Sequence, residues 1–158
     1  MISSRPFEPS FPSSGEPVAK VEVWVGEAGS AVSMPLEALR ILVVDNDMHA
    51  ADSLELLLHA GGFAQTRVAY TAHGALSIAT EFHPSVALIE LDLRDMGSYE
   101  LGQLLRERAQ LQRLRLIAVT DSRAHHERDF ARNAGFERYL LKPISALDLT
   151  KLLTTTPA

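Results

Sequence analysis

The chain has 158 residues, a net charge of -5, 46% hydrophobic residues and no cysteine. This length fits one domain of ordinary size, about 100 to 150 residues, and excludes a second full domain. The missing cysteine excludes disulfides and thiolate metal sites and favours a reducing, cytoplasmic location, while the mild negative charge argues against nucleic-acid binding. No apolar run approaches the roughly 18 residues of a membrane span, and the N-terminus lacks a secretory signal pattern.

The first 36 residues are rich in proline, serine and glycine and poor in apolar side chains. Such a segment cannot bury enough surface to offset its ordering entropy, so we expect 1–36 to be a mostly disordered tail. The exception is 18–25, where valines alternate with other residues as in a strand that joins a sheet edge or pairs with a second copy. Met34 offers an alternative translation start. The folded domain is expected over 37–156.

From Leu39 onward, short apolar runs alternate with helical patterns. The apolar runs predict strands over 39–45, 66–69, 86–91, 114–120 and 138–142. Helices are predicted over about 48–60 and 145–153, and two more follow Thr71 and Ser98, with apolar residues at helical spacing in those after 48, 71 and 98. A polar helix is expected over about 123–133. Gly61 and Gly62 are expected to end the first helix, and Thr71 to cap the second.

Five strand-helix units in series predict an α/β fold, a doubly wound five-stranded parallel sheet with helices on both faces and a flexible N-terminal extension. The run 86–91 is almost entirely apolar, as in a strand that is buried on both faces. In such folds, ligands bind at the carboxyl ends of the strands. The residues that follow each strand are therefore the candidates for function.

Polar side chains follow four of the five predicted strands. In chain order they are Asp45-Asn46-Asp47, Glu90 with Asp92, Thr120-Asp121 and Lys142. Carboxylate and carboxamide oxygens suit a hard cation such as Mg²⁺, and a hydroxyl and a lysine beside that ion suit phosphoryl oxygens. No glycine-rich loop follows the first strand, which disfavours dinucleotide or Walker-type phosphate binding.

From Leu39 to Leu153 the chain resembles the receiver domain of two-component response regulators. Five motifs in order carry this resemblance: ILVVDND at 41–47, AHGAL at 72–76, HPSVALIELDL at 83–93, IAVT at 117–120 and YLLKPI at 139–144. The resemblance implies the flavodoxin-like receiver fold. It also implies an aspartate at the end of the third strand that accepts a phosphoryl group from a partner histidine kinase, with Mg²⁺ held by nearby acids.

Carried over by position, the resemblance assigns roles to individual residues. Asp45 matches the first metal acid, Thr120 the hydroxyl that binds the phosphoryl group, Tyr139 the aromatic that is coupled to it, and Lys142 the lysine. The acceptor position falls on Glu90, and the implied metal site consists of Asp45, Asn46, Glu90 and the backbone of Asp92.

The chain departs from the family pattern at several of these positions. Asn46 replaces the second metal acid and removes a negative charge, which should weaken Mg²⁺ binding or abolish it. Glu90 replaces the acceptor aspartate, and its extra methylene shifts the carboxylate; a shift of about 1 Å can slow such a transfer about a hundredfold. Asp121 adds an anion beside Thr120. The usual Pro and Gly of the next loop are replaced by Arg94 and Ser98.

These departures favour a pseudo-receiver that acts through protein contacts without phosphorylation, with Glu90 reaching Lys142 and fixing one switch state. The alternative is a working Mg²⁺-dependent phosphoacceptor with unusual residues. A small α/β enzyme of another kind is disfavoured, because no Ser-His or Cys nucleophile arrangement is present; we expect no enzymatic activity beyond that of a receiver domain.

The chain stops at Ala158, just after the last predicted helix, so we expect a stand-alone module without an output domain. Its expected partner is a protein, either a histidine kinase or a downstream signalling protein. The resemblance further implies that the face formed by 123–153 serves output or homodimer formation. We expect neither nucleic acid nor a membrane as a partner.

Overall fold

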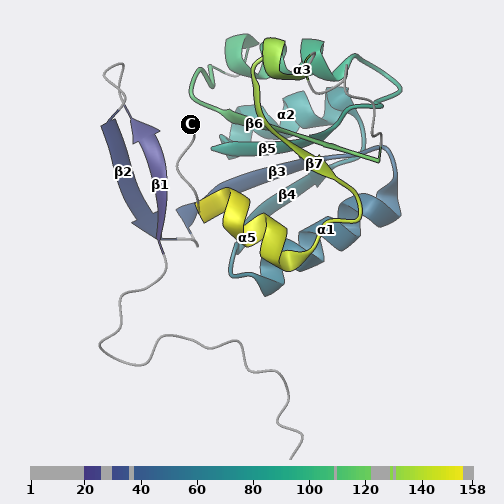
Figure 1. Cartoon of the computed structure of the whole chain (residues 1–158). Coiled ribbons are helices and arrows are strands. Elements are labelled where there is room, and N and C mark those ends of the chain that lie inside the picture. The colour runs from purple at the N-terminus through teal and green to yellow at the C-terminus, as the bar shows by residue number, and fades with distance from the viewer. Residues whose placement is uncertain are drawn as a thin grey trace, which may run out of the picture.

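A five-stranded parallel sheet forms the centre of the domain, in the strand order β4-β3-β5-β6-β7 (Figure 1). The structure is a computed structural model, and it describes residues 20–25, 30–35, 38–108, 110–121, 129 and 131–154. The strands are β3 (Arg40–Val44), β4 (Gln65–Ala69), β5 (Val86–Glu90), β6 (Arg115–Thr120) and β7 (Phe136–Leu141). Every neighbouring pair is parallel, which confirms the predicted α/β sheet.

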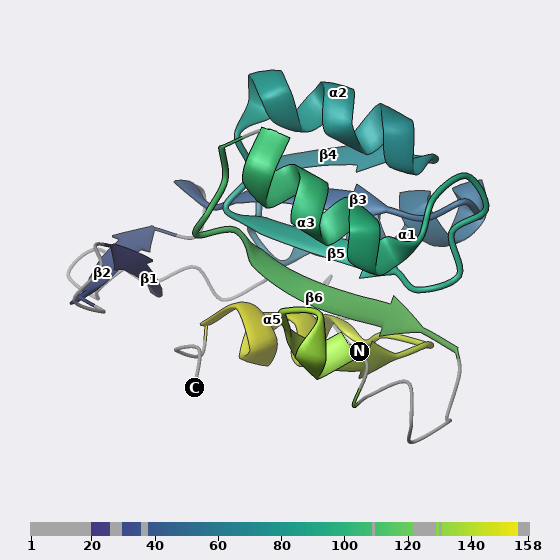
Figure 2. The ribbon, with the colours of Figure 1, turned by 90° about the horizontal axis from the view of Figure 1, so that it is seen from above.

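Helices cover both faces of this sheet. They are α1 (Met48–Ala60), α2 (Ala72–Phe82), α3 (Ser98–Arg108) and α5 (Ala146–Thr154). Figures 1 and 2 show α2 and α3 on one face and α1 and α5 on the other. Most of the helix predicted over 123–133 lies outside the described residues, although 129 and 131–133 are helical.

The alternation of side chains along β3 explains how one strand serves two cores. Leu42 and Val44 pack with α2 and α3, whereas Ile41 and Val43 pack with α1 and α5. Successive side chains of a strand point to opposite faces, so a strand between two helical layers must be apolar throughout. β5 is buried along its whole length for the same reason. The first polar residue after each central strand therefore marks the edge of the core.

Helix ends follow the local sequence. The Asp47 carboxylate accepts hydrogen bonds from the backbone N–H groups of His49 and Ala50 and so caps α1. As predicted, the Thr71 hydroxyl caps α2, and the backbone N–H of Gly61 hydrogen-bonds back to the last turn of α1. Gly62 follows with a φ of 97°, a conformation that glycine adopts at little cost.

A separate two-stranded antiparallel sheet precedes the domain. Its strands are β1 (Lys20–Val25) and β2 (Ser30–Pro35), with Lys20 opposite Pro35 and Val25 opposite Ser30. β1 overlaps the strand predicted over 18–25, and its partner is β2 of the same chain; β2 has no counterpart in the sequence prediction. Of the tail predicted over 1–36, residues 1–19, 26–29 and 36 lie outside the described residues. No helix within the described ranges is long and apolar enough to cross a bilayer.

Replacement of a central core side chain should destabilise the domain. Leu88 in β5 is 1% exposed, whereas Leu56 on α1 is 69% exposed and serves as the matched control. We expect Leu88→Ala to lower the free energy of unfolding by about 2 to 5 kcal/mol, because the surrounding core refills the cavity only in part. Leu56→Ala should change it by less than about 0.5 kcal/mol. Urea unfolding followed by circular dichroism measures both, and equal losses would contradict the described core.

Candidate functional site

The carboxyl ends of four strands bring together the polar residues that the sequence singles out. Asp45 follows β3, Glu90 ends β5, Thr120 ends β6, and Lys142 follows β7. The first three are buried although they are polar. The backbone continues the strand pairing at this edge, since the N–H of Lys142 donates to the carbonyl of Thr120 at 2.8 Å. The fold thus fixes the positions from which these side chains start.

The ammonium of Lys142 lies between two carboxylates. Its Nζ donates a hydrogen bond to Asp45 Oδ2 at 2.7 Å and lies 2.7 Å from Glu90 Oε2. Both carboxylate side chains are only 8% exposed, and that of Lys142 is 27% exposed. The contact expected between the longer side chain of Glu90 and Lys142 is therefore present. We call Asp45, Glu90 and Lys142 the ion triad.

The two contacts of the ammonium differ in kind. The bond to Asp45 has hydrogen-bond geometry, whereas the one to Glu90 Oε2 is an ion pair that lacks a well-aligned hydrogen bond. Burial alone would lower the pKa of Lys142, but its contacts with Asp45 and Glu90 and their negative charges raise that pKa above its usual value. Lys142 is thus a cation at any physiological pH, and it compensates the two buried anions.

Backbone N–H groups occupy the other oxygens of both carboxylates. Asp45 Oδ1 accepts the N–H of Asp47 at 2.9 Å, and Glu90 Oε1 accepts the N–H of Asp92 at 3.2 Å. Asp92 itself is exposed. Each carboxylate is therefore oriented by a donor two residues further along the chain as well as by the ammonium.

Asn46 is engaged on both sides of its carboxamide. The Nδ2 group donates to the carbonyl of Tyr70 at 2.8 Å, and Oδ1 accepts the N–H of Arg94 at 2.7 Å. The oxygen that the sequence offers to a metal ion thus already has a hydrogen-bond partner in the loop after β5. This bridging role was missed by the sequence analysis, because it depends on where two distant loops lie.

The implied Mg²⁺ site fits these residues poorly as they stand. A cation between Asp45 and Glu90 would compete with the ammonium of Lys142, and Asn46 contributes a neutral oxygen that already accepts a hydrogen bond. Within the described part of the chain, no group of three or more acidic, histidine or cysteine side chains is arranged to hold a metal ion.

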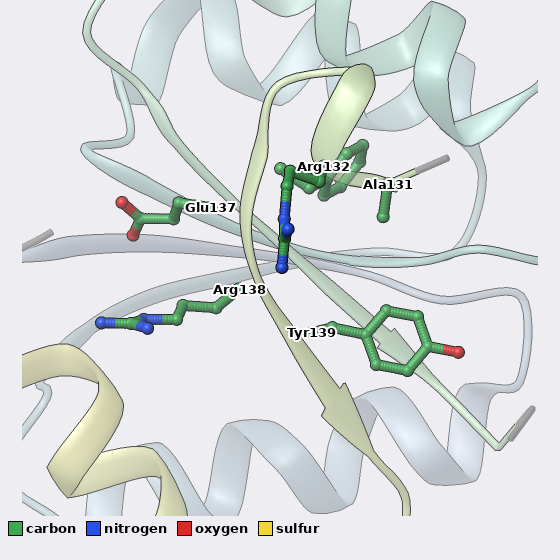
Figure 3. Close-up of a pocket in the computed structure, with 6 residues that line it drawn as sticks. Ala131, Arg132, Glu137, Arg138 and Tyr139 are labelled. Atoms are coloured by element: carbon green, nitrogen blue, oxygen red, sulfur yellow. The ribbon is translucent and has the colours of Figure 1, made fainter. Parts of the chain in front are cut away.

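Thr120 and Tyr139 lie on neighbouring strands. Tyr139 pairs with Ala118 of β6, and Leu141 pairs with Thr120, so alternation places Thr120 and Tyr139 on the same face of the sheet. Figure 3 shows Tyr139 and Arg138 extending to opposite sides of β7. Tyr139 lines a cavity of about 280 Å³ together with Arg132. Asp121, next to Thr120, is exposed, so water screens its charge.

Asp95 in the loop after β5 holds the start of α2. Its carboxylate accepts the backbone N–H groups of Ala72 at 3.0 Å and His73 at 3.1 Å, and lies 2.7 Å from the imidazole Nδ1 of His73. The hydrogen bond from Ala72 and those from His73 outweigh the effect of burial and lower the pKa of Asp95 from 3.8 to about 2. No sequence pattern marks this contact, because the two segments are far apart in the chain.

An apolar groove opens beside the ion triad. It has a volume of about 300 Å³, and its lining includes Leu54 and Leu57 of α1, Val119 of β6 and Ile144 after β7. Asp45 and Lys142 also reach it. A surface formed by α1 and the loop after β7 therefore connects directly to the charged residues.

The pH dependence of stability should report the contact of Asp95 with α2. Because the folded state lowers the pKa of Asp95 from 3.8 to about 2, the ionised carboxylate stabilises the fold above about pH 4, and this contribution disappears as the pH falls toward 2. We expect Asp95→Asn to be destabilised relative to wild type at neutral pH and to converge with it in acid. Asp129→Asn, an exposed control, should show no such convergence. A constant difference across this range would contradict the contact.

Removal of the cation from the ion triad should destabilise the domain in a pH-dependent way. Lys142→Met leaves two poorly exposed carboxylates without compensation, and we expect a loss of about 1 to 3 kcal/mol at neutral pH. Desolvation and mutual repulsion would raise a carboxyl pKa in this variant, so the loss should shrink as the pH falls and one group binds a proton. Thermal unfolding between neutral and mildly acid pH measures this, with the exposed Lys151→Met as control. A loss that stays constant with pH would argue against the triad.

Known proteins are similar to this chain over most of its length. Residues 41–154 match the family model described as the response regulator receiver domain. The chain is 33% identical over 118 residues to an uncharacterized 14.6 kDa protein of Leptolyngbya boryana, covering 75% of this chain and 89% of that one. It is 30% identical over 107 residues to the polar-differentiation response regulator DivK of Brucella ovis, covering 66% of this chain and 84% of that one.

Solved structures give the same result. A CheY-like response regulator receiver domain protein from Methanospirillum hungatei JF-1 superimposes with a TM-score of 0.65 at 29% identity, covering 72% of this chain and 89% of that one. The chemotaxis protein CheY4 of Vibrio cholerae superimposes with a TM-score of 0.67 at 19% identity, over 73% of this chain and 95% of its own, and so supports the fold. With the family match over most of the chain, the protein belongs to the response regulator receiver domains of two-component signalling.

Proposed function

We propose that this receiver domain is a pseudo-receiver, which signals through protein contacts without being phosphorylated at Glu90. The observation that carries the proposal is the ion triad, in which the ammonium of Lys142 lies 2.7 Å from an oxygen of each carboxylate. In a receiver domain this lysine binds a phosphoryl group; here Glu90 itself supplies the anion that the lysine binds. The site is therefore expected to hold one state without phosphorylation.

The position of the acceptor oxygen supports the same function. A nucleophile must approach phosphorus in line with the leaving group, and a displacement of about 1 Å can lower the rate about a hundredfold. Glu90 is one methylene longer than aspartate, and both of its oxygens are engaged, one with Lys142 and the other with the N–H of Asp92. An attack by this carboxylate would have to break contacts that stabilise the folded domain.

Weak or absent Mg²⁺ binding is the second part of the proposal. Receiver domains generally use this ion at the phosphorylation site, where it neutralises charge on the transferring group. Here Asn46 supplies no charge, and its oxygen accepts a hydrogen bond from Arg94. A hard cation depends on the number of charged ligands, so affinity should be low. Asp45, Glu90 and the backbone of Asp92 would hold any ion that enters.

The proposed output is contact with another protein, either a histidine kinase or a downstream signalling protein. The apolar groove between α1 and the loop after β7 supports this, because Asp45 and Lys142 line it together with Leu54 and Leu57. A partner on this surface would contact the triad directly. The homodimer predicted through 123–153 remains a prediction, since 122–128 and 130 lie outside the described residues. The cytoplasmic location also remains a prediction.

A working phosphoacceptor is the second candidate function. It is favoured by one observation, which is that a carboxylate, a hydroxyl and an ammonium from Glu90, Thr120 and Lys142 all remain at the strand ends. Such a protein would transfer a phosphoryl group to Glu90 slowly, with Mg²⁺ bound. The two functions differ in a directly measurable property, the chemical state of Glu90 after exposure to a phosphodonor.

Incubation with Mg²⁺ and acetyl phosphate separates the two functions. We expect the wild-type chain to gain no stable phosphate by intact-mass measurement, and its amide NMR spectrum to remain unchanged with Mg²⁺ and beryllofluoride. The variant with both Glu90→Asp and Asn46→Asp restores the shorter acceptor and the missing charge, so it should bind Mg²⁺ more tightly, at least about tenfold. Asn133→Asp adds the same charge at an exposed position and serves as control.

The phosphorylation and Mg²⁺-binding results decide between the two functions. Stable phosphate on Glu90, or tight Mg²⁺-dependent binding of beryllofluoride by the wild-type chain, would overturn the pseudo-receiver proposal in favour of the second candidate. If the double variant does not gain Mg²⁺ affinity, residues 46 and 90 are not the main obstacle. Asp121, or the loop that lacks its usual Pro and Gly, would then be responsible.

A further inference from the structure

Three loops meet next to the ion triad, and hydrogen bonds outside the triad join them. They are the loops after β3, β4 and β5. Asn46 in the first loop donates from Nδ2 to the carbonyl of Tyr70 in the second, at 2.8 Å. Its Oδ1 accepts the N–H of Arg94 in the third, at 2.7 Å. One side chain thus joins all three loops.

A second set of contacts reinforces this junction. Asp95, the neighbour of Arg94, accepts the N–H groups of Ala72 and His73 at the start of α2, so the loop after β5 is held at two consecutive residues. The hydroxyl of Tyr70 donates to Asp52 of α1 at 2.6 Å. The ends of α1, β4 and α2 are therefore all connected to the loop after β5.

No proline restricts the backbone of this loop. Residues 91–97 contain no proline, and the single glycine is Gly97 at the end. A loop without proline keeps a wide choice of backbone conformations unless other contacts restrict it. Asn46 and Asp95 supply such contacts: Asn46 accepts the N–H of Arg94 in this loop, and Asp95 accepts the N–H of Ala72 at the start of α2. They add to the bond between Glu90 and the N–H of Asp92.

We propose that Asn46 is a positioning residue that holds the loops after β3, β4 and β5 together as one rigid unit, with Asp95 as the second anchor. The role goes beyond the proposed function, because it holds whether or not Glu90 accepts a phosphoryl group. It also gives the replacement of an acid by asparagine a structural meaning: the position gains a donor for the carbonyl of Tyr70 that an aspartate does not have.

Only a carboxamide satisfies both neighbours at this position. Aspartate accepts the N–H of Arg94 but has no donor for the carbonyl of Tyr70, and it would place a negative oxygen near that carbonyl. Alanine satisfies neither group. Asn46→Asp therefore removes only the hydrogen bond to the carbonyl of Tyr70, whereas Asn46→Ala removes that bond and the one from the N–H of Arg94. Aspartate at residue 46 would also add a negative charge for a cation. Aspartate therefore favours Mg²⁺ binding, whereas asparagine favours a rigid loop junction.

NMR measurements on the full chain, without metal or phosphodonor, test this role. The readouts are the hydrogen exchange of the Arg94 and Ala72 amides and the carbonyl carbon shift of Tyr70. In Asn46→Ala we expect exchange at Arg94 to accelerate about tenfold or more, with a smaller acceleration at Ala72, because Asp95 follows Arg94 directly. In Asn46→Asp, protection at Arg94 should be retained while the Tyr70 carbonyl shift changes. Asn133→Ala and Asn133→Asp should leave all three signals unchanged.

The core amides of β5 show whether a variant has lost global stability instead. A general loss accelerates exchange at Ile89 as much as at Arg94, whereas release of the junction affects Arg94 and Ala72 alone. Unchanged exchange at both Arg94 and Ala72 in Asn46→Ala would overturn the proposal, and so would equal acceleration at Ile89. Because no phosphodonor is present, failure here is distinct from failure of the pseudo-receiver proposal.

Discussion

The ammonium of Lys142, set between the carboxylates of Asp45 and Glu90, is the interaction on which the carboxyl edge of this sheet depends. Two carboxylates that are each 8% exposed would repel each other in a medium that screens charge poorly. The cation arrives from a position 97 residues further along the chain than Asp45, so the contact forms only when β3 and β7 take their places in one sheet. The two buried carboxylates therefore need the cation from β7 for their compensation, and that cation reaches them only in the folded sheet.

Hydrogen bonds connect the ion triad and its neighbour Asn46 to the loops that follow the strands. Asp45 and Glu90 each accept a backbone N–H from the loop that follows them, and Asn46, next to Asp45, accepts one from Arg94. Two of the residues that depart from the receiver pattern make contacts here. Asn46 joins the loops after β4 and β5, and Glu90 has the length to contact Lys142. The proposed loss of phosphorylation rests on both residues, whereas the proposed rigidity of the loops rests on Asn46 and Asp95.

The sequence was sufficient to predict the sheet and the residues at its edge. Apolar runs such as 86–91 mark buried strands, and parallel topology places their carboxyl ends together, which explains why Asp45, Glu90 and Lys142 could be expected to meet. The contact of Glu90 with Lys142 also followed from the length of the side chain. These predictions rest on periodicity and topology, which are local or nearly local properties of a sequence.

The loop contacts could not be predicted in the same way. Asp95 as an acceptor at the start of α2, and Asn46 between the carbonyl of Tyr70 and the N–H of Arg94, depend on backbone positions in loops that are far apart in the chain and have no repeating pattern. Asn46 was expected to be a neutral metal ligand. The contact of its oxygen with Arg94, a residue 48 positions away, was not predicted. The strand β2 was missed as well, since it lies in a segment whose composition resembles that of a disordered tail.

The most direct test of the central claim is an NMR measurement of the Lys142 side-chain ammonium during a titration with Mg²⁺. If Lys142 already occupies the place between Asp45 and Glu90, its ¹⁵Nζ signal should stay at the position of a hydrogen-bonded ammonium and remain unchanged as Mg²⁺ is added. The signal of the exposed Lys151 provides the internal reference. A Lys142 signal that shifts or broadens with Mg²⁺, as the ion displaces the ammonium from the carboxylates, would contradict the account.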